Sequence, residues 1–215
     1  VIPAFIVDAE SHAYLEKLVA SLHGLTVIIV DDASPFSVHL NGVHIVRHDT
    51  NKGPAAARNT GIAVVATKVV ACVDTDVMVT TAQIAKLAAY VTDSRIGAVA
   101  PRITCINDRT FIGEFESQHS PLDLGSIPAL VRPMSRVSYL PATVLVCNME
   151  SLNVVNGFDE SIRMGEDVDL VCLACLVYLV EQDNQMSESN YINQTNQTDK
   201  NKQEKQAGSR VSRTT

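Results

Sequence analysis

The sequence predicts an α/β fold with a Rossmann-like, mainly parallel sheet flanked by helices. Short runs of β-branched and other apolar residues at 27–30, 43–46 and 69–73 are typical of buried strands. Segments with helical apolar spacing separate these runs, and strands that alternate with such helices form parallel sheets through right-handed crossovers. Acidic residues follow several of the strands, and ligands of such sheets bind at the carboxyl ends of the strands.

The first half of the chain opens with a strand and a helix. Residues 1–7 are the first expected strand, and the apolar spacing of residues 15–22 predicts a helix. Ser11 is expected to cap this helix, and Gly24 to end it, because these residue types are favoured at those positions.

Three more strands and two helices are expected before residue 92. The strands at 27–30 and 43–46 come first, and Pro54 then opens an alanine-rich helix that extends to residue 66. The strand at 69–73 follows, and it leads into a helix whose apolar residues repeat from Ile84 to Val91.

The second half of the chain has a weaker pattern. Prolines and a glycine interrupt residues 103–136, which is typical of a long functional loop over a site. Residues 137–147 are expected to form one or two further strands, and residues 149–155 a short helix that Gly157 ends. A last apolar helix is expected over about 166–180.

We expect one domain, residues 1–180, followed by a disordered polar tail, residues 181–215. The chain has 215 residues and is 46% hydrophobic, which is enough material for one core. From Glu181 onward polar residues dominate, so the tail cannot bury enough surface to offset its ordering entropy. Because the chain begins at Val1 rather than Met, we expect it to be a fragment.

Composition argues against several classes of protein. A formal net charge of −7 without a basic stripe argues against nucleic-acid binding. The 5 cysteines are odd in number and scattered through apolar stretches, which favours a reducing compartment and a cytoplasmic location. The longest apolar run, residues 170–180, has 11 residues, so no transmembrane segment is expected, since a span needs roughly 20.

Asp74-Thr75-Asp76 comes directly after an expected buried strand. Two carboxylates on one turn suit a diphosphate-linked sugar, because one can bind a hard divalent cation while the other meets the ribose. The cation would bridge the phosphates and stabilise charge on the leaving group. An Asp-x-Asp turn is also a common solvated loop end, so the motif alone leaves both interpretations open.

Asp31-Asp32-Ala33-Ser34 follows the second strand in a similar position. A carboxylate there can accept a hydrogen bond from a base N–H or a ribose hydroxyl. The alternative is a turn or helix cap formed by Asp32 and Ser34.

The segment 51–59, Asn-Lys-Gly-Pro-Ala-Ala-Ala-Arg-Asn, joins a glycine-containing loop to a helix N-terminus. Lys52 and Arg58 supply positive charge within reach of an anion that such a helix start would attract. A surface ion pair on an ordinary helix is the alternative.

Gly157-Phe158-Asp159-Glu160 is followed by Gly165-Glu166-Asp167-Val168-Asp169-Leu170. Three carboxylates at a helix start are also favoured by the helix dipole alone. The occurrence of all four clusters in one chain, in the order that a nucleotide-sugar enzyme needs, favours the catalytic interpretation.

These ordered motifs resemble the family 2 glycosyltransferases of the GT-A fold over roughly residues 1–172. More narrowly, Ser120-Pro-Leu-Asp-Leu-Gly125, Val131-Arg-Pro and Ser135-Arg-Val-Ser-Tyr139 are similar to the mycofactocin-system glycosyltransferases. The resemblance implies a fold for nucleotide-diphospho-sugar transfer.

The resemblance also implies roles for individual residues. Those implied to contact the nucleotide-sugar are Asp31 or Asp32, Lys52, Gly53, Arg58 and Asp74, with Asp74 at the ribose or phosphate. Asp76 would bind Mg²⁺ or Mn²⁺. Asp167 corresponds to the catalytic base of the family, and its neighbour Glu166 is the second residue expected to be catalytic.

The implied reaction inverts the anomeric carbon in one displacement. Asp167 would take the proton from an acceptor hydroxyl as it attacks, and UDP would depart onto the metal. The implied donor is UDP-glucose, and the implied acceptor is a small molecule, the peptide-derived redox cofactor of the mycofactocin system.

The sequence also departs from the family. It has no Trp, so the Gln-x-x-Arg-Trp acceptor motif of processive relatives is absent. The family's Trp-Arg-bearing helix does not follow Leu170, so the resemblance implies a domain that is truncated at its C-terminal end. Two alternatives stay open: a catalytically inactive nucleotide-binding fragment, and a family 2 enzyme acting on a cell-envelope polysaccharide or lipid acceptor. A nucleotidyltransferase of similar architecture is disfavoured, since residues 165–170 would then have no task.

Overall fold

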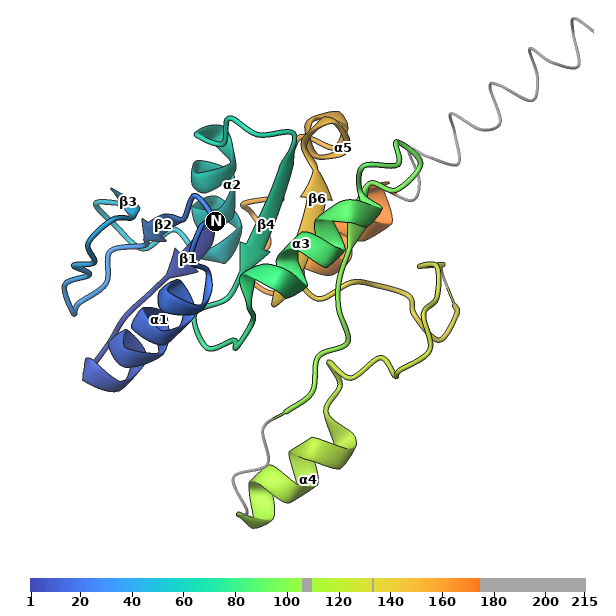
Figure 1. The fold of residues 1–215 in the computed structure, drawn as a ribbon, viewed down its shortest axis with the longest axis horizontal. Coiled ribbons are helices and arrows are strands. Elements are labelled where there is room, and N and C mark those ends of the chain that lie inside the picture. Colours follow the sequence, from blue (N-terminus) through green and yellow to red (C-terminus); the bar gives the residue numbers. More distant parts are fainter. Residues whose placement is uncertain (106–109, 133, 175–215) are drawn as a thin grey trace, which may run out of the picture. The chain divides into compact units, whose positions relative to one another are not determined.

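The computed structural model describes residues 1–105, 110–132 and 134–174 (Figure 1). Their helices and strands form an α/β arrangement with two three-stranded sheets. The expected polar tail and the end of the last expected helix lie outside the described residues. Within the described ranges, no helix combines the length and apolarity needed to cross a membrane.

The first sheet is entirely parallel, with the order β1-β2-β3. It contains β1 (Ile2–Ala4), β2 (Ile28–Asp31) and β3 (His44–Arg47). Ile29 of β2 lies opposite both Ile2 and Ile45, which fixes the register. The carboxyl ends of these strands therefore meet at one edge, as the sequence predicts.

The second sheet has the order β4-β6-β5 and is antiparallel. It contains β4 (Val69–Val73), β5 (Ala98–Val99) and β6 (Val144–Asn148). The expected strand at 69–73 is confirmed residue for residue. Of the range 137–147, in which one or two strands were expected, only the end forms a strand, β6. The antiparallel direction of β6 and the two-residue strand β5 were not predicted.

Two backbone hydrogen bonds at Val1 connect the two sheets. The amino group of Val1 donates to the carbonyl of Ala71 at 2.7 Å, and Val73 N donates to the carbonyl of Val1 at 3.0 Å. This pattern aligns the start of the chain parallel to β4. The strands therefore follow one another as β3-β2-β1-β4-β6-β5, and five of these six strands run in the same direction, with β6 reversed.

The helices of the first half are α1 (Ala9–Ser21), α2 (Pro54–Ala63) and α3 (Thr81–Tyr90). Pro54 occupies the first turn of α2, as predicted. The cap of α1 is Asp8 rather than Ser11, because the Asp8 carboxylate accepts from Ser11 N while the Ser11 hydroxyl accepts from Asp8 N. Ser11 is thus the third helical residue (N3), and it forms a reciprocal capping box with the N-cap residue Asp8.

The helices of the second half are α4 (Phe111–His119), α5 (Met149–Val154) and a helix that begins at residue 166 and is described to 174. The last two agree with the expected helices. By contrast, α4 lies inside the segment that was expected to be irregular throughout.

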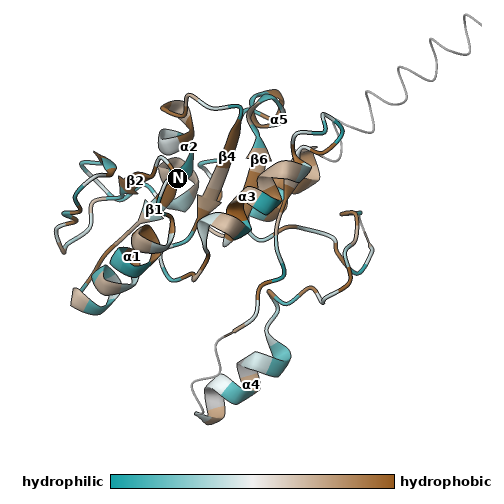
Figure 2. Cartoon of the chain, in the orientation of Figure 1, coloured by the Kyte–Doolittle hydropathy of each residue, from teal (hydrophilic) through white to brown (hydrophobic). Residues whose placement is uncertain are grey.

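One hydrophobic core extends over both sheets. It joins residues of the parallel sheet, such as Ile2 and Ile29, with Val144 and Val146 of the antiparallel sheet. Figure 2 shows these central strands as largely hydrophobic. A second cluster packs α2 against the other side of β4 and β6 through Ala55, Ile62 and Leu145.

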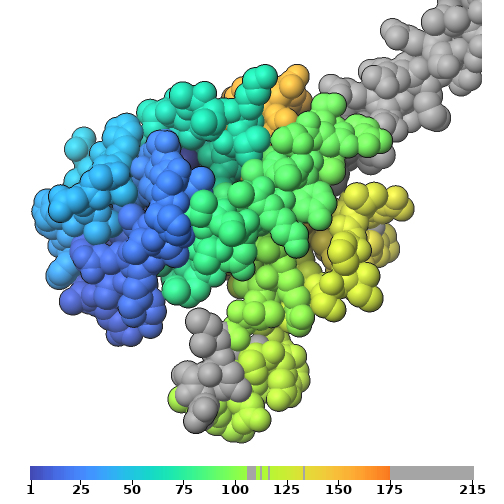
Figure 3. All heavy atoms as spheres, in the orientation of Figure 1, coloured from blue at the N-terminus to red at the C-terminus, as the bar shows by residue number. Residues whose placement is uncertain are grey.

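The end of α1 contacts the turn that precedes α3. The Ser21 hydroxyl donates to the carbonyl of Val79 at 2.6 Å, and the Thr81 hydroxyl donates to the carbonyl of His23 at 2.8 Å. In Figure 3 the blue N-terminal segment and the green segment accordingly lie in contact. These bonds tie the segment after Asp76 to the first half of the fold.

Candidate active site

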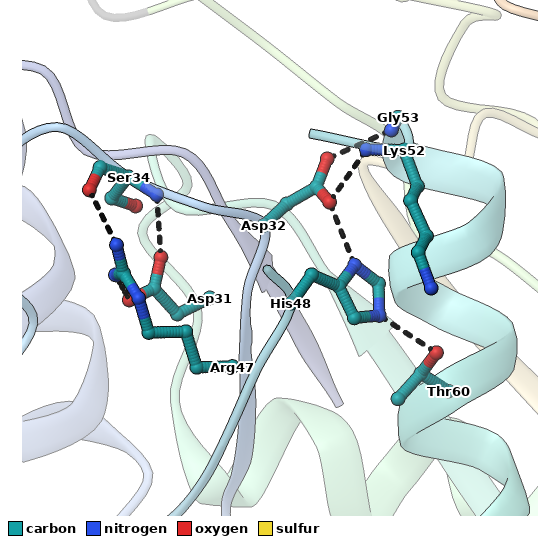
Figure 4. A network of polar contacts seen from close by, with 8 residues as sticks. All are labelled: Asp31, Asp32, Ser34, Arg47, His48, Lys52, Gly53 and Thr60. Carbon is teal, nitrogen blue, oxygen red and sulfur yellow. Dashed lines mark hydrogen bonds and ion pairs between the residues drawn. The ribbon is translucent and has the colours of Figure 1, made fainter. Parts of the chain in front are cut away.

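Asp31, the last residue of β2, is tied to its own surroundings. Its buried carboxylate forms an ion pair with Arg47, the last residue of β3, and accepts a hydrogen bond from Ser34 N at 2.9 Å (Figure 4). Arg47 also donates to the carbonyl of Ser34 at 3.0 Å. The Asp31 side chain therefore shapes the turn after β2.

Asp32 organises the loop that leads into α2. One of its oxygens accepts from Lys52 N and the other from Gly53 N, both at 2.8 Å. His48 Nδ1 lies 2.7 Å from the first oxygen, and His48 Nε2 lies 2.9 Å from the Thr60 hydroxyl on α2 (Figure 4). Asp32 is only 4% exposed, and both of its carboxylate oxygens take part in these contacts.

The loop at 52–53 uses its backbone rather than the Lys52 side chain in this network. Lys52 is exposed and contacts Asp32 through its N–H alone. Gly53 has φ of +94° at the N-cap of α2, a conformation that favours glycine because other residues carry a Cβ that clashes there. Asp32 therefore fixes the entry of the chain into α2.

Arg58 brings together three segments that are distant in the sequence. It lies on α2 and is 3% exposed, with Nη1 donating to Glu166 Oε1 at 2.5 Å and Nη2 donating to Asp74 Oδ1 at 2.8 Å. The sequence left open a surface ion pair for Arg58, but the structure shows that Arg58 forms two buried salt bridges instead. This contact brings the Asp74 turn and the start of the last helix to one place.

The charges in this cluster shift one another's ionisation. Burial raises the pKa of Asp74, and the guanidinium of Arg58 opposes that rise, while Asp76 and Glu166 add to it. Burial alone would lower the pKa of Arg58, but Asp74 and the hydrogen bonds of both carboxylates outweigh it and leave that pKa raised. The carboxylates outnumber the one guanidinium, so the cluster favours a further cation.

The Gly157 segment supports Arg58 from another side. The Phe158 ring lies 5.4 Å from the guanidinium carbon of Arg58. Asn59, the next residue on α2, donates to the carbonyl of Phe158 at 2.8 Å and accepts from its N–H at 2.9 Å. Two of the clusters found in the sequence therefore pack directly against each other.

Asp167 is held by backbone groups alone. Oδ2 accepts from Ala142 N at 3.1 Å, and Oδ1 accepts from Val168 N at 2.8 Å. Each carboxylate oxygen has two acceptor sites, so one site on each remains for a ligand. Asp167 is partly exposed, whereas its neighbour Glu166 is buried.

Asp76 is exposed, two residues beyond Asp74. Among the described residues no group of three or more His, Cys, Asp or Glu side chains is arranged to hold a metal ion. A hard cation such as Mg²⁺ usually takes one or two carboxylates together with substrate phosphates and waters. Asp76 beside Asp74 fits that kind of site, in which the ligand supplies part of the coordination.

Sequence reasoning missed three residues of these networks: Arg47, His48 and Thr60. The position of Arg47 and His48 at the end of the third strand is a signal, because its carboxyl end lies beside that of β2. Nothing in the local pattern marks Thr60, which meets His48 only because α2 packs against β2. The roles predicted for the site residues stay predictions.

Comparison with known proteins identifies a family. The sequence profile of Glycosyl transferase family 2 matches residues 1–141. The chain is also 42% identical over 164 residues to the Pre-mycofactocin glycosyltransferase of Mycobacterium tuberculosis, in strains CDC 1551 / Oshkosh and ATCC 25618 / H37Rv. This match covers 73% of the chain and 35% of the relative, so the chain spans about a third of the length of these curated relatives.

Solved structures share the fold at low sequence identity. S. aureus TarS 1-349 in complex with UDP has a TM-score of 0.59 at 18% identity, covering 81% of this chain and 53% of that one. Its complex with UDP-GlcNAc gives 0.58 at 18%, with 80% and 51% covered. The mannosyltransferase PcManGT from Pyrobaculum calidifontis, in complex with GDP-Man and Mn²⁺, gives 0.51 at 15%, with 79% and 49% covered.

The predicted GT-A type fold with a mainly parallel sheet is thereby confirmed. The family profile extends from the first strand to Pro141, across the Asp32, Arg58 and Asp74 segments whose contacts build the cluster. This chain belongs to glycosyl transferase family 2.

Proposed function

We propose that this chain is the catalytic domain of a metal-dependent, inverting glycosyltransferase that moves a sugar from a UDP-sugar to an acceptor hydroxyl. The observation that carries the proposal is the Arg58 cluster. It places the Asp74-Asp76 turn beside the helix start that bears Asp167, although 91 residues separate Asp76 from Asp167. A donor-side turn and a base must be neighbours in a single displacement.

The residues divide into a donor side and an acceptor side. Asp74, whose side chain is 32% exposed, can accept hydrogen bonds from the ribose, and Asp76 would hold Mg²⁺ or Mn²⁺. When bound, the cation neutralises the charge that develops on the departing diphosphate. Arg58 keeps Asp74 in place, and Asp32 shapes the nearby loop at 52–53.

Asp167 would act as the base. Its carboxylate takes the proton of the acceptor hydroxyl while the hydroxyl oxygen forms a bond to the anomeric carbon. The bond from that carbon to the diphosphate oxygen breaks in the same step, and its electron pair leaves with UDP. Attack opposite the leaving group inverts the anomeric carbon.

The nature of the donor and acceptor is a finer proposal. The solved relatives that bind UDP and UDP-GlcNAc support a uridine nucleotide, and the mycobacterial relative supports an acceptor of the mycofactocin system. We propose UDP-glucose as the donor and a peptide-derived acceptor. A panel of UDP- and GDP-sugars, assayed for donor hydrolysis and transfer, tests the donor; binding of UDP without turnover of any donor would favour an inactive nucleotide-binding domain.

The metal proposal is tested with Asp76→Ala. Wild-type protein should bind UDP more tightly when Mg²⁺ or Mn²⁺ is added, and the variant should lose that increase because the diphosphate loses its charge bridge. Isothermal titration calorimetry with and without the metal measures it. Asp93→Ala, which removes a half-exposed aspartate paired with Arg95, is the control and should keep the increase. An unchanged metal effect in Asp76→Ala would exclude Asp76 from the site.

A further inference from the structure

Glu166 and Asp74 share Arg58 but differ in access to solvent. The Asp74 side chain is 32% exposed, whereas the Glu166 side chain is 10% exposed and the Arg58 side chain is 4% exposed. A ligand can therefore reach Asp74 but meets little of Glu166. A carboxylate so enclosed is badly placed to exchange a proton with a substrate.

The position of the Arg58 guanidinium depends on its two carboxylates. Nη1 donates to the carboxylate of Glu166, and Nη2 donates to the carboxylate of Asp74. Nε of Arg58 is the one buried side-chain nitrogen or oxygen in the described part of the chain that lacks a hydrogen-bond partner. The ring of Phe158 limits the guanidinium on one face but accepts no hydrogen bond from it. Removing the charge of Glu166 therefore leaves Asp74 as the single anion that holds Arg58.

We propose that Glu166 is a positioning residue that couples nucleotide binding at Asp74 to the order of the helix start that carries Asp167; this inference rests on the proposed function. A ligand that fixes Asp74 also fixes Arg58, and Arg58 then holds Glu166. Asp167 is the next residue, so the helix start that bears its carboxylate becomes less mobile in the same event. The base is thus best ordered when a donor is present.

The coupling must be reciprocal, because it is a free energy shared by the two sites. Couplings of this kind change an equilibrium constant by about fivefold to 150-fold. A nucleotide should therefore slow the local opening of the helix that begins at residue 166, and loss of the Glu166 charge should weaken that effect without removing the nucleotide site.

Hydrogen exchange by mass spectrometry tests the proposal on peptides within residues 160–174, with and without saturating UDP and Mg²⁺. In wild-type protein UDP should slow exchange there by about fivefold or more. Glu166→Gln keeps the size of the side chain and should lose most of this protection while still binding UDP. Asp169→Asn makes the same acid-to-amide change on the same helix and should retain the protection.

A kinetic measurement separates positioning from a merely structural role. Glu166→Gln should lower kcat while KM for the donor changes by less than about threefold, because Asp74 remains available to the nucleotide. Equal UDP-dependent protection in wild type and Glu166→Gln, or none in wild type that binds UDP, would overturn the coupling alone. Failure of wild-type protein to bind UDP would overturn the proposed function and this inference together.

Discussion

Asp167 has the contacts expected of a fixed but accessible carboxylate. Two backbone N–H groups hold it, and an acceptor site on each oxygen remains open. Asp167→Asn removes the basicity, so transfer should fall by about 10² to 10⁴, the usual contribution of a general base. Steady-state transfer assays measure the fall, and calorimetry should show nearly unchanged UDP affinity.

The substitution has a structural cost that needs its own control. The oxygen of the new amide can still accept a hydrogen bond, but its NH2 cannot, so the NH2 would face either Ala142 N or Val168 N and one of the two bonds would be lost. A thermal melt should therefore show a modest loss of stability, and activity should be compared well below the melting temperature. Transfer by Asp167→Asn at the wild-type rate would rule out Asp167 as the base.

Asp74 should give the protein a specific pH dependence of stability. Burial raises the pKa of Asp74 in the folded protein above the ordinary value of 3.8. Between these two pKa values the folded protein therefore binds more protons than the unfolded chain. The contribution of Asp74 to the free energy of unfolding should fall as the pH rises from 3.8 through the raised pKa. Urea unfolding of wild type and Asp74→Asn, from about pH 4 to about pH 7, isolates this contribution.

The stability of wild type relative to Asp74→Asn should decrease steadily over that range. A relative stability that grows with pH would mean that Arg58 dominates and that the folded pKa of Asp74 is lowered.

Sequence reasoning could identify the residue types of the site but not their partners. Arg58 was compatible with a nucleotide contact or with a surface ion pair, and the structure shows a third arrangement, a buried contact with two carboxylates. Its partner Glu166 lies 108 residues away, a separation that no local pattern encodes. Likewise Asp32 meets His48 only because β2 and β3 are neighbours.

Among the elements, α2 has the closest packing against the sheets. A Cβ added at Gly61 would clash with the Val1 side chain and lie 3.2 Å from Val30 Cγ2. We expect Gly61→Ala to destabilise the fold by up to about 2 kcal/mol, because overpacking costs about 1–3 kcal/mol and the helix propensity of alanine returns up to about 1 kcal/mol. Chemical denaturation measures the change.

Ala63→Ser is the matched control for this helix. Ala63 is exposed on α2, so adding one atom there should change the free energy of unfolding by no more than about 0.5 kcal/mol. If Gly61→Ala were instead stabilising, the Val1 side chain would have to move aside at little cost.

Elements with a strong local pattern were predictable, and those defined by distant contacts were not. The β-branched run 69–73 matches β4, and Pro54 correctly marks the start of α2. The two residues of β5 are too few to show a period, and only pairing with β6 makes them a strand. At α1 both Asp8 and Ser11 are suitable caps, and the backbone geometry selected Asp8.

For the whole molecule, alternation of strands and helices was enough to predict the α/β class. The direction of β6 was not predictable, because an apolar run looks the same in parallel and antiparallel sheets. Its direction is visible only in the pairing, where Val144 at the start of β6 lies opposite Val73 at the end of β4. The two strands are joined through a long connection between residues 99 and 144. That connection contains α4, whose apolar residues are exposed at Phe111 and Phe115 and so left no clear amphipathic signal.

The two salt bridges of Arg58 also set an order of events in time. Its pairing with Asp74 closes a loop of 16 residues and its pairing with Glu166 one of 108 residues, so the second closure costs about 1.7 kcal/mol more chain entropy. During synthesis at about 5–20 residues per second, Glu166 leaves the ribosome about 5 to 20 seconds after Arg58. A nascent chain can therefore form the Arg58–Asp74 contact before the Arg58–Glu166 contact.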